Sequence, residues 1–179
     1  MKHRKRLGFT LPEVLVTVAI IATLAAVLLP ALIGQVGKGD SARAAEDLLA
    51  VQTGITAFVS DVRRYPSELD HLTSAVSTTD FDLVSSTYPG NLVAKWKGPY
   101  LSKRLTNGDL KTTLGGDIKG QFTQILDDGA TFLGVQIAGM SLTDFNKLDE
   151  IIDEVANSST GLLRYNASNT TSFLATPVQ

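Results

Sequence analysis

The first pattern along the chain is an apolar stretch at residues 14–33, which contains no charged side chain. As a helix, about 20 residues span roughly 30 Å, which is the thickness of the hydrocarbon core of a bilayer. Four basic residues precede the stretch within the first six positions. They predict that the N-terminus stays in the cytoplasm while the rest of the chain is exported. No small-residue cleavage site ends the stretch, so we expect the chain to keep it.

A second pattern follows at residues 40–63, where apolar residues recur at spacings of three and four. This spacing predicts an amphipathic helix with one buried face. Glycines within residues 37–39 favour a break before it, with Asp40 or Ser41 as the cap of a new helix. Alternatively, both apolar patterns belong to one nearly continuous helix from about residue 11 to residue 63. The expected buried stripe consists of Ala45, Leu48, Leu49, Ile55, Phe58, Val59 and Val62.

Strand patterns follow in the C-terminal part of the chain. Alternating apolar and polar residues at 122–126 and 131–137 flank Asp128-Gly129, which is a strong signal for a β-hairpin. Two further strands are expected in the segments GLLRYN and TSFLATPVQ. Together with the helices, these strands predict an α+β fold, in which an antiparallel sheet packs across the amphipathic half of the long helix.

Another helix is predicted at residues 141–155, beginning at a Ser141 or Thr143 cap. Its expected buried face consists of Leu142, Phe145, Leu148, Ile151, Ile152 and Val155. The same segment carries the acidic residues Asp144, Asp149, Glu150, Asp153 and Glu154. Asp149 and Asp153 are four residues apart, so they share one helix face and are candidates to contact a cation. A solvated acidic face explains the same spacing, and we favour that interpretation.

Composition narrows the possible chemistry. The formal net charge of −2 gives no basic field, so no nucleic-acid partner is predicted. The chain has no cysteine, which excludes disulfides, thiolate metal sites and cysteine nucleophiles. Its two histidines, His3 and His71, form no recognisable constellation of nucleophile, base and acid. We therefore predict no catalytic residue, no metal and no cofactor, and we expect that the chain is not an enzyme.

The opening residues carry the most specific signal in the chain. The run Gly8-Phe9-Thr10-Leu11-Pro12-Glu13, followed directly by the apolar stretch, resembles the processing site of type IV prepilins and type II secretion pseudopilins. The resemblance implies that a prepilin peptidase cleaves after Gly8 and methylates the new amino group of Phe9. It also implies that the mature subunit waits in the inner membrane, until an assembly platform polymerises it with identical or related pilin subunits.

The same resemblance divides the chain into parts. Residues 1–8 are the leader peptide, and residues 9–36 form the hydrophobic helix of the membrane and the filament core. Residues 37–179 form a pilin-like head that includes the amphipathic helix at 40–63. The expected partners are the prepilin peptidase, other pilin subunits, the assembly platform and membrane lipid. Before assembly the subunit spans the inner membrane once with a periplasmic head. Afterwards it lies in an extracellular pilus or a periplasmic pseudopilus.

Glu13 and Pro30 interrupt the hydrophobic character of the N-terminal helix. A carboxylate at the edge of hydrocarbon is costly. The resemblance implies that Glu13 pairs with the N-terminal amine of an adjacent subunit and thereby sets the axial register. Alternatively, Glu13 caps the helix start, where a carboxylate complements the helix dipole, and the two roles are compatible. Pro30 lacks the N–H that would bond to Ala26, so we expect the helix to be weakest between about Thr23 and Pro30.

Three functions remain open at this stage. The leading expectation is a structural subunit of a type IV pilus-like filament. The alternative is a pseudopilin of a type II secretion system, because residues 96–101 (WKGPYL), with Tyr65-Pro66 before them, resemble major pseudopilins. The Asp-Pro-Trp-Gly element of the calcium loop in those pseudopilins is absent, which weakens that alternative. The third function is a membrane-anchored exported enzyme or binding protein that uses the apolar segment as a tether.

Overall fold

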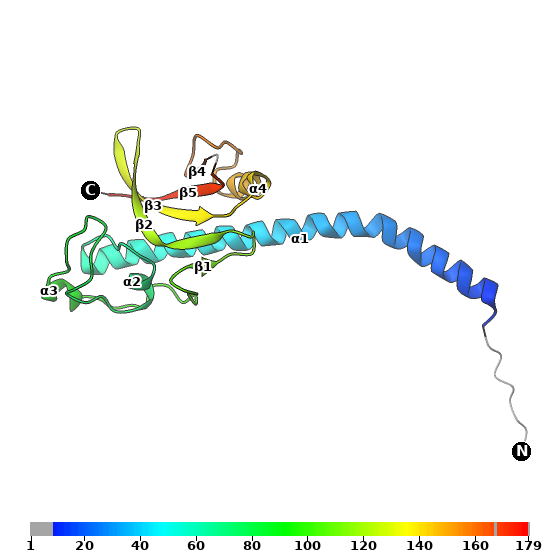
Figure 1. Ribbon diagram of the computed structural model, residues 1–179, viewed down its shortest axis with the longest axis horizontal. Helices are drawn as coiled ribbons and strands as arrows, with labels where there is room; N and C mark the ends of the chain where they lie inside the picture. The colour runs from blue at the N-terminus through cyan, green and yellow to red at the C-terminus, as the bar shows by residue number, and fades with distance from the viewer. Residues whose placement is uncertain (1–8, 167, 179) are drawn as a thin grey trace, which may run out of the picture. The chain divides into compact units, whose positions relative to one another are not determined.

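Figure 1 shows the computed structural model, which describes residues 9–166 and 168–178, apart from the side chains at positions 31, 33, 34 and 36. The expected leader, residues 1–8, lies outside the described residues. The chain forms two compact units, which are Met1–Gly39 and Asp40–Gln179. The second unit contains the whole sheet and is called the head below.

Helix α1 (Leu11–Val62) is one element of 52 residues, so the break predicted at residues 37–39 does not occur. A glycine in a helix interior costs only about 1 kcal/mol relative to alanine, because no hydrogen bond of the helix is lost. Asp40 therefore continues the helix instead of capping a new one, and its carboxylate lies 3.6 Å from Arg43 one turn later. The alternative of a nearly continuous helix is confirmed.

The buried face of α1 in the head differs slightly from the predicted stripe. Its fully buried side chains are Leu48, Val51, Ile55, Phe58 and Val62, which follow one another at spacings of three and four. Leu49 was expected to be buried, but it is 48% exposed, because it lies about 100° around the helix from Leu48. Val59 is only partly buried, whereas Val51 was missed.

The head contains one antiparallel five-stranded sheet with the order β1-β2-β3-β5-β4. Its strands are β1 (Leu110–Lys111), β2 (Asp117–Asp127), β3 (Ala130–Ala138), β4 (Leu163–Tyr165) and β5 (Thr170–Pro177). The predicted hairpin is confirmed, since Asp127 pairs with Ala130 across the turn. Asp128 and Gly129 both have positive φ angles, 47° and 80°, as a type I′ turn requires. The two predicted final strands correspond to β4 and β5.

The core lies between the sheet and the head portion of α1. Phe122, Val135 and Phe173 are paired across β2, β3 and β5, and all three are buried in the same cluster as the α1 stripe. The side-chain amide of Gln52 on α1 also donates to the carbonyl of Ala175 on β5, at 2.5 Å. Figure 1 shows the sheet over this part of the helix. The predicted α+β, pilin-like fold is therefore confirmed.

Helix α4 (Leu142–Ile152) begins as predicted, because the Ser141 side chain accepts the backbone N–H of Asp144. It ends three residues before the predicted end at Val155. The chain reverses there, since Glu154 has a φ of 66° and the Asp153 carboxylate binds backbone N–H groups of the following loop. The predicted buried face was partly wrong, because Leu142, Ile151 and Val155 are exposed whereas Asp149 is fully buried.

Two short helices complete the head. Helix α2 (Asp70–Thr73) precedes the loop at residues 74–89, and helix α3 (Gly90–Val93) follows it. The loop between them is held by Asp82, which is 3% exposed. Asp82 accepts the backbone N–H groups of Val84 and Ser86 and an N–H of Arg64.

Candidate functional site

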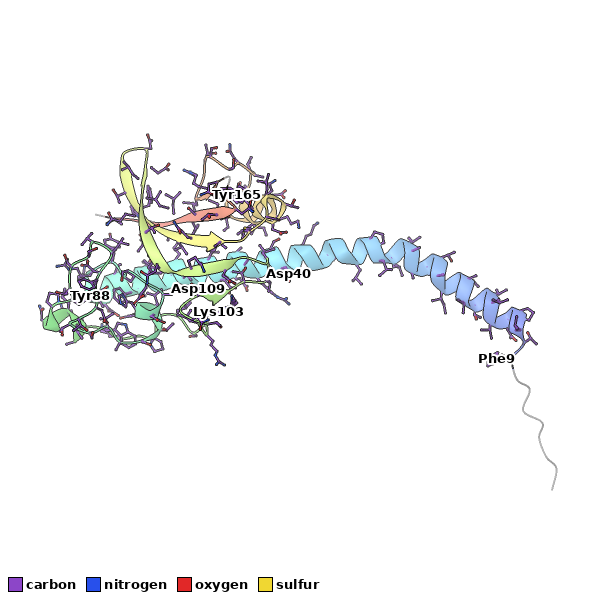
Figure 2. The ribbon with its side chains drawn as sticks, viewed as in Figure 1. Phe9, Asp40, Tyr88, Lys103, Asp109 and Tyr165 are labelled. Carbon is purple, nitrogen blue, oxygen red and sulfur yellow. The ribbon has the colours of Figure 1, made fainter. Side chains whose placement is uncertain are left out.

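The start of α1 forms a capped helix end with an exposed aromatic residue before it. Phe9 is 85% exposed and precedes the helix (Figure 2). The carbonyl of Thr10 accepts the N–H of Val14 at 3.2 Å, which makes Thr10 the N-cap. The Glu13 carboxylate reaches back to the N–H of Thr10 at 3.5 Å, as the third residue of a capping box does. This geometry supports the capping role of Glu13. Gly8 lies outside the described residues.

The following surface of α1 is apolar on all sides. Leu11–Pro30 is a candidate membrane span of 20 residues with a mean hydropathy of 2.3, and none of it is buried inside the protein. The two hydroxyl groups in this span are satisfied locally. Thr17 donates to the carbonyl of Val14 at 2.9 Å, and Thr23 donates to the carbonyl of Ile20 at 2.8 Å. Glu13 is therefore the one charged side chain within an otherwise apolar segment.

Pro30 lies inside α1, which continues through it. Proline has no N–H, so the carbonyl of Ala26 loses its usual helical donor at this point. The expectation that the segment from Thr23 to Pro30 is the weakest part of the helix in a filament stays a prediction.

In the head, the loop that follows α3 is anchored on α1 by two ion pairs. Lys97 Nζ lies 2.9 Å from Asp61 Oδ1, and Lys103 Nζ lies 2.6 Å from Asp47 Oδ1. The hydrogen bond from Lys97 lowers the pKa of Asp61, and the bond to Asp47 raises the pKa of Lys103. The sequence analysis missed both pairs. The available signal was two aspartates beside the apolar stripe, two heptads or about four helical turns apart.

The WKGPYL segment belongs to this anchored loop. Trp96 Nε1 donates to the carbonyl of His71 at 3.0 Å, and the Tyr100 hydroxyl donates to Asp61 at 3.1 Å. The Tyr100 ring also meets Phe58 of α1 edge to face, at 5.7 Å between ring centroids. The segment that resembles major pseudopilins thus joins α2 to the C-terminal part of α1.

His71 is a buried core residue. Its ring stacks on Phe58 at 6.4 Å, and its Nδ1 lies 3.4 Å from the hydroxyl of Tyr88. Burial lowers the pKa of His71, although Glu68, at 3.5 Å from Nε2, acts in the opposite direction. Burial also raises the pKa of Tyr88. The rings of Phe58, His71 and Tyr88 pack against one another in the core, so this cluster stabilises the head.

A polar cavity of about 480 Å³ opens on the head between the start of α2, the turn at residues 107–109 and strand β2. Two of its charged groups pair with each other, since Lys119 Nζ lies 2.5 Å from Asp109 Oδ2. Asp109 also accepts the backbone N–H of Gly120, and these bonds hold the pKa of Asp109 below its usual range. Within residues 9–166 and 168–178, no group of three or more acidic, histidine or cysteine side chains is arranged to hold a metal ion.

Comparison with known proteins finds a family match in the N-terminal segment and one relative that aligns over nearly its whole length. Residues 3–29 match the family described as the prokaryotic N-terminal methylation motif. The type II secretion system core protein G of Vibrio cholerae is 29% identical over 153 residues, which cover 80% of this chain and 98% of that protein. No solved structure matches the chain.

Two further core G proteins match over a shorter length. The one from Aeromonas hydrophila is 34% identical over 43% of this chain and 54% of its own length. The one from Escherichia coli K12 is 31% identical over 47% of this chain and 58% of its own length. The chain thus spans little more than half of these two relatives. It carries a prepilin-type N-terminal methylation motif and is homologous to the core protein G pseudopilins of type II secretion systems.

Proposed function

We propose that this chain is a pseudopilin, a structural filament subunit of a type II secretion system, and not an enzyme. The observation that carries the proposal is the match to the core protein G of Vibrio cholerae over 98% of that protein. The WKGPYL segment supports it, because its contacts with Asp61 and Phe58 make it part of the head structure. We therefore favour a type II secretion pseudopilin over a type IV pilin, although the pilin was the leading expectation from the sequence.

The N-terminal residues supply the processing and assembly functions in this proposal. A prepilin peptidase cleaves between Gly8 and Phe9 and methylates the amino group of Phe9. Glu13 then pairs with that amine on a neighbouring subunit. Such a pair gives register more than net stability, because removing both charges from water is expensive. The capping bond to Thr10 is long, at 3.5 Å, so it leaves the Glu13 carboxylate available for a stronger partner.

The division of the chain follows from the same proposal. Residues 1–8 are removed as the leader, residues 9–36 serve as the membrane anchor and later the filament core, and residues 37–179 remain the periplasmic head. The partners are the peptidase, further pilin-like subunits and the inner-membrane platform that extracts each subunit from lipid. The apolar surface of Leu11–Pro30, with no part buried in the protein, suits both lipid and neighbouring helices.

The test compares secretion with surface fibres in a strain that lacks this chain. A pseudopilin deletion reduces the amount of enzymes secreted into the medium, and the full chain restores it. Gly8→Trp serves as the matched control, because we expect it to be expressed and inserted but not cleaved, and therefore not to restore secretion. Loss of surface fibres with unchanged secretion would instead identify a type IV pilin.

A further inference from the structure

Asp149 is a buried carboxyl group with one oxygen that no donor reaches. The residue is 0% exposed on helix α4. Its Oδ2 accepts the backbone N–H of Asn157 at 2.7 Å. Its Oδ1 is equally buried and receives no hydrogen bond from the described part of the chain. An ionised carboxylate in this position would lack solvation at one oxygen, which is costly inside a protein.

The second carboxyl group of the site is that of Asp153, one helical turn later. Asp153 is the C-cap residue of α4, four residues after Asp149, so the two side chains lie on the same face of the helix end. Its Oδ2 accepts the backbone N–H groups of Leu162 and Leu163, at 2.7 and 3.0 Å. Gly161 has a φ of 90°, and a Cβ atom there would lie 2.3 Å from the same oxygen. The loop at residues 153–163 therefore folds tightly onto these two carboxyl groups.

The charged groups around the pair do not neutralise it. Arg164 on β4 donates to Asp127 at 2.8 Å and to the carbonyls of Gly161 and Leu163. Its guanidinium thus ties the loop to the end of β2, next to the hairpin turn. Burial raises the pKa of Asp149, and contact with Asp153 adds to the increase. The N–H of Asn157 and the charge of Arg164 act in the opposite direction without cancelling it.

We propose that Asp149 and Asp153 share one proton, which Asp149 Oδ1 carries and donates to Asp153, and that this acid pair holds the loop at residues 153–163 on helix α4. The proton supplies the donor that Asp149 Oδ1 otherwise lacks. It also leaves each Oδ2 free to accept the backbone N–H groups of the loop. Loss of the proton places two negative charges in contact, one of them fully buried, and favours opening of the loop.

The direction of the pH dependence follows from the raised pKa of Asp149. A raised value in the folded state means that the folded protein binds this proton more tightly than the open form does. The stabilisation is therefore complete at acidic pH and is lost as pH rises through the folded-state pKa. One proton changes the opening equilibrium by at most about tenfold per pH unit. The loop is thus an acid-stabilised element on one side of the head.

Hydrogen exchange of the full chain in detergent micelles tests the proposal between about pH 5 and pH 9. The reporters are the amides of Asn157, Leu162 and Leu163, corrected for their intrinsic exchange rates. In the wild type, their protection should fall by up to about tenfold per pH unit once the proton leaves. Asp149→Asn should keep its protection across the range, because the amide nitrogen replaces the acid as donor to Asp153. Glu150→Gln, an exposed neutralisation on the same helix, should behave as the wild type.

Several outcomes would overturn the shared proton. One is protection in the wild type that does not change with pH, or protection that Asp149→Asn abolishes at every pH. Another is an increase in amide protection when calcium or magnesium chloride is added to the wild type but not when it is added to Asp149→Asn. That result would identify a metal site. If Asp149→Asn does not fold, the carboxyl carbon resonances of the wild type decide. Asp149 must then titrate above the ordinary aspartate pKa of about 3.9, and titration at that ordinary value contradicts the proposal.

Discussion

The ammonium group of Lys103, in the loop that follows helix α3, lies 2.6 Å from the carboxylate of Asp47 on α1. The Asp47 residue is 8% exposed, although it lies beside the buried stripe of α1 and not within it. The pair therefore fixes the loop along α1 and shields the core beneath it.

We expect Asp47→Asn to destabilise the head by about 1 kcal/mol, as loss of a partly exposed ion pair does. The isosteric change keeps the shape of the side chain while it removes the charge that faces Lys103. Chemical denaturation of the full chain in micelles measures the difference. The control is Asp40→Asn on the same helix, whose partner Arg43 is more exposed than Lys103 and lies 3.6 Å away, and its loss should be smaller. An equal or larger loss in the control would contradict the role given to Asp47.

Processing is expected at Gly8–Phe9. Intact-mass measurement of purified subunits should begin at a methylated Phe9. A bulky residue at position 8 should block cleavage, because the peptidase requires a residue without a side chain there. Processing of Gly8→Trp at the wild-type rate would remove the main support for a prepilin.

The role of Glu13 is tested by Glu13→Gln, which keeps size and polarity but removes the charge. The variant should insert normally, since one charge fewer eases entry into the membrane. The head should melt at the wild-type temperature, because Glu13 lies outside it. Filaments should be scarce, since an unpaired buried amine costs about 3–5 kcal/mol. A normal filament yield would contradict the pairing with a neighbouring amine and leave Glu13 with its capping role alone.

Pro30 should mark a loss of regular helix in the assembled filament. Ordered helical hydrogen bonds are expected to disappear between Thr23 and Pro30, because the freed carbonyl of Ala26 weakens this turn. A filament map resolves this directly, and a regular helix through the segment would refute the prediction. Pro30→Ala restores the missing N–H and should make fibres less extensible.

His71 gives the head a dependence on pH in the acidic range. Because burial lowers its pKa in the folded state, the unfolded chain takes up the proton first. The stabilisation is complete above about pH 6.5, the usual pKa of histidine, and falls as pH decreases toward the folded-state value. Denaturation at several pH values measures the slope. His71→Phe should reduce this slope, because it removes the titrating imidazole. The variant should still fold, since the phenyl ring retains the stack on Phe58 and Tyr88 still donates to the carbonyl of Tyr65.

The features predicted from the sequence are those set by short-range patterns. The β2–β3 hairpin is one, because Asp128-Gly129 specifies its turn without help from the rest of the chain. The sequence analysis left a continuous α1 as one of two alternatives, because a glycine destabilises a helix only near its own position. The processing signal was also recognisable, as six adjacent residues carry it.

The features that the sequence did not predict depend on segments distant in the chain. Asp149 was placed on a solvated face, because no pattern indicates that the N–H of Asn157 returns to its carboxylate. The contact of Asp47 with Lys103 joins a helix to a loop with two short helices between them. Such contacts follow from the packed fold, and spacing within one segment carries no information about them.

The single tryptophan of the chain lies within the WKGPYL segment. Trp96 is partly buried, its ring centroid is 5.5 Å from that of Tyr100, and its indole N–H is bonded to His71. Ultraviolet emission from this protein therefore originates at the junction of α2 with α1. Its spectrum should shift to longer wavelength when that junction opens and remain constant when the N-terminal helix exchanges lipid for detergent. The chain thus contains an optical probe that reports on the head without an added label.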